Sequence, residues 1–131
     1  MVFLDTDVMV NFLRKEPNAV SLIKKLKEEE EPLKTTTINE FELWKGAYRK
    51  KTEESHNSVK NLLSELEISD LTSVASKKAA EIFENLQSKG ETTDVLDVMI
   101  ASIVIINEEM LATQNIKHFG RISELKIMQK T

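Results

Sequence analysis

Met1-Val2-Phe3-Leu4-Asp5 is a run of four apolar residues that ends in a carboxylate. Its unbroken apolar character predicts a buried strand, and Thr6 and Asp7 are residue types that cap helices, here one over residues 8–14. A strand that passes directly into a helix is typical of an α/β fold. Ligands of open α/β sheets bind beyond the carboxyl ends of the strands, which is where we expect Asp5.

The same order of strand and helix continues along the chain. Further strands are predicted over residues 33–37, around Ile68, over 110–113 and over 125–128. Helices are predicted from Pro17 to the acidic run at 28–31, over 39–50, 53–66 and 75–86, and from about 93 to 107. This alternation predicts a mostly parallel sheet with helices on both faces. No repeat or linker interrupts the pattern, so we expect residues 1–131 to form one domain.

The composition restricts the class of protein. Of the 131 residues, 40% are hydrophobic and 31% charged, with 3 Gly and 2 Pro, which is typical of a helix-rich globular protein. The absence of Cys excludes disulfides, thiolate zinc sites and cysteine nucleophiles. The apolar residues before Asp5 are too few for a signal peptide, and the longest apolar run, 98–106, is about half the length of a membrane span. We therefore expect a soluble, cytoplasmic protein.

Asp5 and Asp97 are carboxylates in apolar surroundings. On a helical wheel Asp97 lies beside Ile100 and Val104, where an unpaired charge is unfavourable. Convergence of the two carboxylates on a cation would remove this difficulty. A helix cap is the alternative for Asp5, and the same holds for Asp94, which lies near the start of the helix that carries Asp97.

The helix predicted over residues 39–50 offers two acids, Glu40 and Glu42. The wheel places Glu40 among the apolar residues and Glu42 on the other face, where a surface ion pair with Lys45 is the alternative to a ligand role. Gly46, one turn beyond Glu42, is unfavourable within a helix and indicates close approach of another group. Periodicity alone does not choose between the two acids.

A hard divalent cation is the cofactor that this set of residues favours. Mg²⁺ and Mn²⁺ bind carboxylates and water, whereas zinc fits poorly in a chain with no Cys and only two His. The net charge of −4 gives no general attraction to nucleic acid, so a polyanion would depend on bound metal or local basic patches. No Ser-His-Asp arrangement, phosphate-binding glycine loop or dinucleotide fingerprint is present.

Four motifs occur in the order found in PIN domains. They are LDTDVMVN at 4–11, TTINEFELWKGA at 36–47, DVMIAS at 97–102 and ATQNIKHF at 112–119. The chain most closely resembles the VapC-type ribonuclease toxins of toxin–antitoxin pairs, from residue 4 to about residue 122. The resemblance implies an α/β/α sandwich and a Mg²⁺- or Mn²⁺-dependent endoribonuclease. It also implies a homodimer and an antitoxin protein as partner.

In such a ribonuclease the catalytic, metal-binding acids correspond to Asp5, Glu42 and Asp97, so the resemblance selects Glu42 over Glu40. A fourth acid common in the family is missing, because Asn115 and His118 stand in its places. Possible additional ligands or acids are Asp94 and Asn115. Thr6 and Thr113 are expected to orient the carboxylates, and the RNA backbone is expected to contact Lys45, Arg49, Lys117 and Arg121.

Two alternatives remain open at this stage. With its acidic set incomplete, the domain would be a catalytically impaired PIN-like module that binds RNA or protein. In the second alternative the chain is a helical scaffold whose acids serve only as caps and surface pairs.

Overall fold

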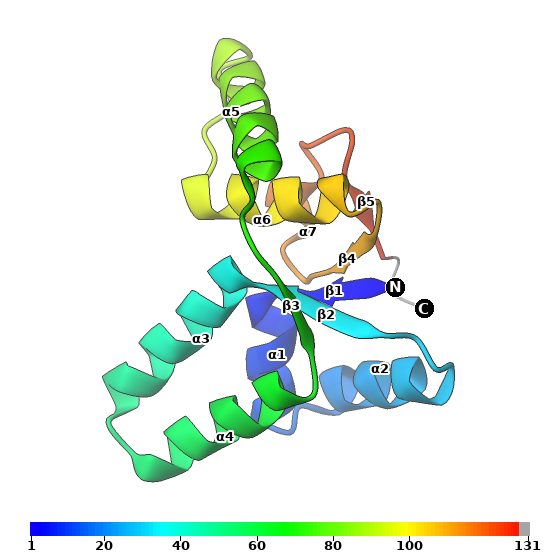
Figure 1. Cartoon of the computed structure of the whole chain (residues 1–131), viewed down its shortest axis with the longest axis vertical. Coiled ribbons are helices and arrows are strands. Elements are labelled where there is room, and N and C mark those ends of the chain that lie inside the picture. Colours follow the sequence, from blue (N-terminus) through cyan, green and yellow to red (C-terminus); the bar gives the residue numbers. More distant parts are fainter. Residues whose placement is uncertain (129–131) are drawn as a thin grey trace.

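A computed structural model, described here for residues 1–128, shows a central sheet between two layers of helices (Figure 1). The strands are β1 (Val2–Leu4), β2 (Leu33–Thr36), β3 (Glu67–Ser69), β4 (Met110–Ala112) and β5 (Lys126–Ile127). They lie in the order β3-β2-β1-β4-β5, and every neighbouring pair is parallel. The predicted α/β fold is confirmed.

The helices divide between the two faces of the sheet. They are α1 (Thr6–Leu13), α2 (Pro17–Glu28), α3 (Thr37–Lys50), α4 (Glu53–Ser64), α5 (Ser73–Ser88), α6 (Val95–Ile106) and α7 (Ile116–Phe119). In Figure 1, α1 to α4 lie below the sheet and α5 to α7 above it. None of the helices within residues 1–128 is long and apolar enough to cross a membrane.

Alternation along β1 explains the two cores. Val2 and Leu4 pack with α1 to α4, whereas Phe3, which points to the opposite face, packs with α5, α6 and α7. Leu111 and Ala112 of β4 divide between the same two clusters. The central strands are therefore buried on both faces, which accounts for their continuous apolar sequence.

The order of the strands creates a crevice at one edge of the sheet. From β1 the chain moves outward through β2 to β3, and it then returns across β1 to form β4 on the other side. The connections after β1 and β4 therefore leave on opposite faces, and ligands of open α/β sheets bind at such a switch point. Asp5 follows β1 and Thr113 follows β4, so both residues lie there.

Several helix boundaries differ from the sequence prediction. Helix α1 begins at Thr6 rather than at residue 8, because the side chain of Asp5 caps it in place of Thr6 or Asp7, and α5 covers Ser73–Ser88 rather than 75–86. The side chain of Thr36 accepts a hydrogen bond from the backbone N–H of Asn39, so α3 begins at Thr37 rather than at residue 39. Asp94 caps α6 in the same way through Leu96, so that helix begins at Val95. The short helix α7 was not predicted.

Candidate active site

Asp5 is the centre of a hydrogen-bond network at the switch point. The residue is only 6% exposed, and Oδ1 accepts hydrogen bonds from the backbone N–H of Thr6 at 2.8 Å and from Nδ2 of Asn39 at 3.0 Å. Oδ2 accepts from the hydroxyl of Thr113 at 2.6 Å. Burial raises the pKa of Asp5, and these hydrogen bonds oppose the shift. Asp5 therefore caps α1 and also faces the crevice.

Glu42 is joined to Asp5 through Thr6 and Asn39. The hydroxyl of Thr6 donates to Oε1 of Glu42 at 2.6 Å and accepts from Nδ2 of Asn39 at 2.9 Å. Asn39 is fully buried, and its Oδ1 accepts from the hydroxyl of Thr36 at 2.7 Å, which fixes the orientation of the amide. The acid of α3 that reaches the network is thus Glu42.

Asp97 adds a third carboxylate from the opposite layer. It lies in the first turn of α6 with its side chain 18% exposed. Burial is the largest cause that raises its pKa to about 7, followed by the negative charges of Asp94, Asp5, Glu42 and Asp7. Helix α6 packs against α3, which carries Glu42, and Nδ1 of His118, in the helix after β4, lies 4.0 Å from Oδ2 of Asp97. Three acids that are distant in sequence therefore gather at one edge of the sheet.

Asp7 belongs to the same group, although the sequence indicated only a cap. Its Oδ2 accepts from the backbone N–H of Gln114 at 3.0 Å, while Oδ1 is buried and has no hydrogen-bond partner within residues 1–128. Burial and the charge of Asp5 raise the pKa of Asp7 to about 6. The Asp5-Thr6-Asp7 sequence could have predicted that Asp7 lies beside Asp5, since residues in the first helical turn after a strand lie near the carboxyl end of that strand.

The chemistry of the donors fits a hard divalent cation. Carboxylate and hydroxyl oxygens meet at the switch point, and one buried carboxylate oxygen lacks a partner within residues 1–128. Burial, and then the negative charges of neighbouring acids, raises the pKa of Asp7 to about 6 and that of Asp97 to about 7. As they stand, no three acidic or histidine side chains of the described chain are arranged closely enough to hold an ion. Thr6 and Thr113 instead hold Glu42 and Asp5 by hydrogen bonds.

The remaining predicted site residues have distinct surroundings. Asp94 is exposed and caps α6, as the capping alternative proposed, and Asn115 donates its backbone N–H to the hydroxyl of Thr113 at 3.0 Å. Nδ1 of His118 lies 4.0 Å from Oδ2 of Asp97, so His118 borders the acids.

The basic candidates also differ from one another. Lys45, Arg49 and Lys117 are exposed. Arg121 instead donates to the carbonyl of Thr92 at 2.8 Å, which fixes the loop before α6. The prediction that another group of the protein approaches Gly46 closely is wrong, because a Cβ at Gly46 would meet no atom within 4 Å.

The sequence profile of the PIN domain matches residues 2–125, and the chain belongs to this family. Within it, the chain is 31% identical over 123 residues to Ribonuclease VapC2 of Rickettsia felis, which covers 93% of this chain and 92% of that protein. The predicted resemblance to VapC-type ribonucleases is thereby confirmed.

Solved structures agree with the observed fold. The crystal structure of VapBC2 from Rickettsia felis bound to a DNA fragment from their promoter contains a chain that is 29% identical and superimposes with a TM-score of 0.88, covering 98% of both chains. A chain of DNA-bound VapBC from Salmonella typhimurium, 22% identical, matches with a TM-score of 0.84 over 99% of this chain and 98% of that one. The second likeness concerns the fold alone.

Proposed function

We propose that this chain is a metal-dependent endoribonuclease of the VapC type and the toxin of a toxin–antitoxin pair. Membership of the PIN family and the likeness to a ribonuclease support the reaction class. The observation that carries the proposal is the gathering of Asp5, Glu42 and Asp97, from three separate elements, at the switch point of the sheet.

A cation answers the electrostatic problem that these acids create. Burial, followed by the negative charges of neighbouring acids, raises the pKa values of Asp7 and Asp97. No Lys or Arg within the described residues makes an ion pair with any of Asp5, Glu42 or Asp97. Asp5, Glu42 and Asp97 would hold Mg²⁺ or Mn²⁺, which when bound activates water and stabilises charge at the phosphorus. Asp7, Asp94 and Asn115 would contribute from the border of the site.

The polar residues around the acids keep them in place. The hydroxyl of Thr113 accepts from the backbone N–H of Asn115, so its own proton is directed toward Asp5. Asn39 supplies both protons of its amide nitrogen, one to Asp5 and one to Thr6. These hydrogen bonds restrict the side-chain motion of the carboxylates before a ligand binds. Less conformational entropy is then lost when the site is assembled around the ligand.

RNA is the proposed substrate. A phosphodiester approaches an acidic crevice only when positive charge is present, which the metal and nearby cations supply. Lys45 and Arg49 on α3 and Lys117 on α7 are exposed and carry this role in our proposal. Arg121 is left out, since its guanidinium group is bound to the loop before α6.

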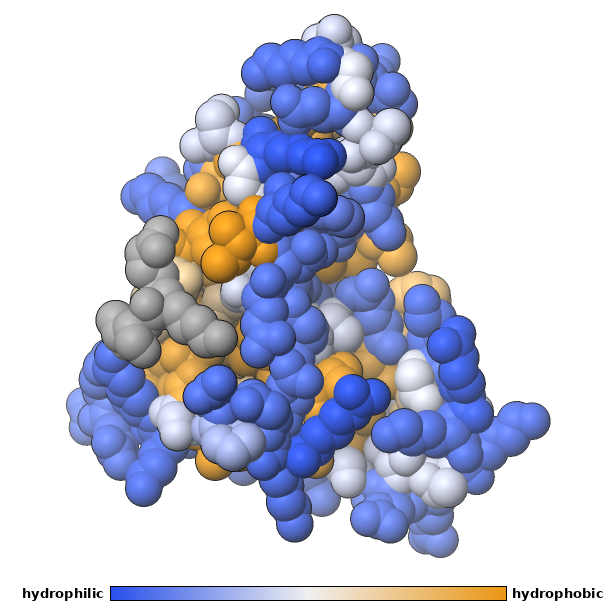
Figure 2. Space-filling model, turned by 180° about the vertical axis from the view of Figure 1, so that it is seen from behind, coloured by the Kyte–Doolittle hydropathy of each residue, from blue (hydrophilic) through white to orange (hydrophobic). Residues whose placement is uncertain are grey.

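An antitoxin is the proposed protein partner, and a groove next to the acids supports this assignment. The groove has a volume of about 530 Å³ and is lined by residues of α1, α2, the β4 to α7 connection and the end of β5, among them Leu22, Ile116 and Met128. Thr113 and Gln114, which contact Asp5 and Asp7, also line it, so a segment bound there would reach the active site. Figure 2 shows apolar surface on the side where β5 ends.

The chain is also proposed to form a homodimer. Apolar side chains such as Val20, Ile106 and Met110 are partly exposed and available for this contact. Light scattering of the purified chain should give twice the mass of one chain, and a monomeric mass at micromolar concentration would contradict the proposal.

Cleavage of single-stranded RNA tests the main proposal. The purified chain should cleave with Mg²⁺ or Mn²⁺ and stop when a chelator is added. Asp5→Asn, Glu42→Gln and Asp97→Asn should each lower the rate by at least about 100-fold, because each removes a ligand charge. Glu40→Gln is the matched control on the same helix and should retain the rate.

Two further results would contradict or redirect the proposal. Cleavage that persists in chelator, or that is insensitive to all three substitutions, would refute the assigned site. RNA binding without any cleavage would favour the alternative of a catalytically impaired binding module. Manganese calorimetry separates this case from an acid-capped scaffold, because a scaffold shows no binding that Asp97→Asn removes.

A further inference from the structure

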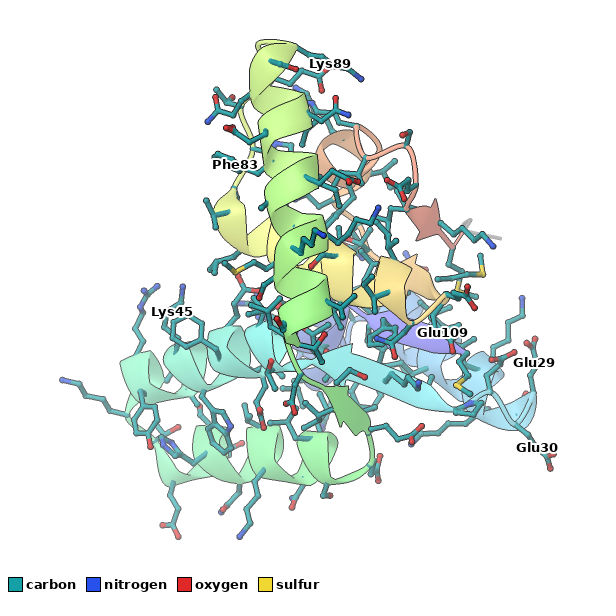
Figure 3. All side chains as sticks on the ribbon, turned by 45° about the horizontal axis from the view of Figure 1, so that its top comes forward. Glu29, Glu30, Lys45, Phe83, Lys89 and Glu109 are labelled. Carbon is teal, nitrogen blue, oxygen red and sulfur yellow. The ribbon has the colours of Figure 1, made fainter. Side chains whose placement is uncertain are left out.

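Phe41 is an exposed aromatic residue immediately before the acid Glu42. The residue is 54% exposed, and neither hydrophobic core of residues 1–128 includes it. The one ring contact that Phe41 makes within the described chain is with Lys45, whose Nζ lies 5.7 Å from the ring centroid. In Figure 3, Lys45 projects from the edge of α3 that faces α6. Phe41 therefore contributes little to the packing of the described chain.

The other aromatic residues of α3 have partners in the protein. The rings of Trp44 and Tyr48 lie 5.7 Å and 4.6 Å from that of His56 on α4, centroid to centroid. They therefore belong to the packing of α3 against α4. Phe41 differs from both, since its partner is a cation and its chain neighbour is a residue of the acidic crevice.

The helical spacing brings three chemical functions together. Lys45 is one turn from both Phe41 and Glu42, so an aromatic face, an ammonium group and a carboxylate occupy adjacent positions on α3. The ammonium–ring contact keeps the first two together. No side chain would contact a Cβ at Gly46, so the surface one turn beyond Glu42 is open.

These functions match the parts of a single-stranded nucleotide. An acidic site repels phosphate, whereas stacking of a base on an aromatic ring does not depend on net charge and is available to any unpaired base. We infer that Phe41 and Lys45 form a nucleotide platform on which an RNA base stacks on the ring and its phosphate meets the ammonium group, beside Glu42. This inference rests on the proposed ribonuclease function and names how the substrate is positioned.

Fluorescence of a single-stranded RNA that contains 2-aminopurine tests the platform, because stacking on a ring quenches this base. With Ca²⁺ in place of Mg²⁺, the wild-type chain should quench the probe on binding. Phe41→Ala and Phe41→Leu should weaken binding by about 5- to 150-fold and lose the quenching, while Phe41→Trp should keep both. Lys45→Ala should lower the slope of log affinity against log salt by about 0.7.

Cleavage with Mg²⁺ gives the second readout. Phe41→Ala should raise KM while kcat stays close to the wild-type value, as expected for a group that binds ground state and transition state alike. Tyr48→Ala is the control, because Tyr48 is exposed on the same helix but packs against His56. It should behave as wild type, and thermal melts should show that every variant folds.

The outcomes separate the two proposals. If Phe41→Ala or Phe41→Leu keeps the wild-type affinity or the wild-type KM, the platform is overturned. If the wild-type chain still cleaves RNA in that case, the ribonuclease assignment stands. A wild-type chain that neither binds nor cleaves the RNA overturns both.

Discussion

Replacement of Asp97 by Asn should stabilise the metal-free protein at neutral and alkaline pH. The pKa of Asp97 is about 7 in the folded chain, mainly because of burial and then because of the neighbouring acids, against about 3.9 for an unfolded aspartate. The folded state thus holds a proton that the unfolded state loses between about pH 4 and pH 7. Asp97 therefore contributes a loss of stability that grows as the pH rises through this window.

The size of the effect follows from the same shift. Three pKa units correspond to an upper limit of about 4 kcal/mol, at 1.36 kcal/mol per unit. The Asp97 side chain is 18% exposed at the crevice, so solvent and relaxation reduce this figure, and we expect roughly 1–2 kcal/mol above pH 7. Asn has nearly the shape of Asp and no charge, so Asp97→Asn should recover this amount.

Urea unfolding in the presence of a chelator, at pH values from 4 to 8, measures the effect. The stability difference between Asp97→Asn and wild type should be near zero at pH 4, grow up to pH 7 and then level off. Mg²⁺ should stabilise the wild type, by about 2.7 kcal/mol at 100 times its Kd, and have a much smaller effect on the variant. Asp70→Asn, at an exposed position before α5, is the control. A gain that is the same at every pH would refute the electrostatic account.

Two further predictions concern residues that support the site. Asn39→Asp places a second carboxylate against Asp5 and removes two donated hydrogen bonds. The urea midpoint at pH 7 should therefore fall by the equivalent of about 3 kcal/mol and partly recover at pH 5. Equal losses at both pH values would contradict the charge argument. Gly120→Ala brings a Cβ to 2.7 Å from the backbone oxygen of Ile116, so the free energy of unfolding should fall by about 1–3 kcal/mol. Wild-type stability of this variant in urea would show that α7 can shift to accommodate the Cβ without strain.

The sequence was sufficient to predict the layers of the fold because the longer helices and the central strands each have a recognisable apolar pattern. Val2, Phe3 and Leu4 are apolar without interruption since a parallel strand is buried on both faces, and α6 is apolar almost throughout since the sheet and α5 cover it. The helix α7 escaped prediction for the opposite reason. Four residues span about one turn, which is too short for any periodic pattern to appear.

The site was only partly predictable. A helical wheel describes one helix, and the question whether Glu40 or Glu42 faces the crevice depends on where α3 lies against β1, so the resemblance to PIN domains had to decide. Asn39 was overlooked as a site residue because its role consists of contacts with Asp5 and Thr6, more than 30 residues earlier in the chain. Asp97 was proposed as a site residue from its apolar neighbours, although α6 begins later than predicted.

The hydrogen bond between Thr113 and Asp5 joins residues separated by 108 positions. A ribosome must therefore release nearly the whole polypeptide before the first strand acquires its neighbour β4 and the acids acquire their final surroundings. Nascent or truncated chains that end before β4 lack this closure. The topology of the sheet therefore delays assembly of the acids until nearly the whole chain has been made, and a truncated chain should be inactive if the full chain cleaves RNA as proposed.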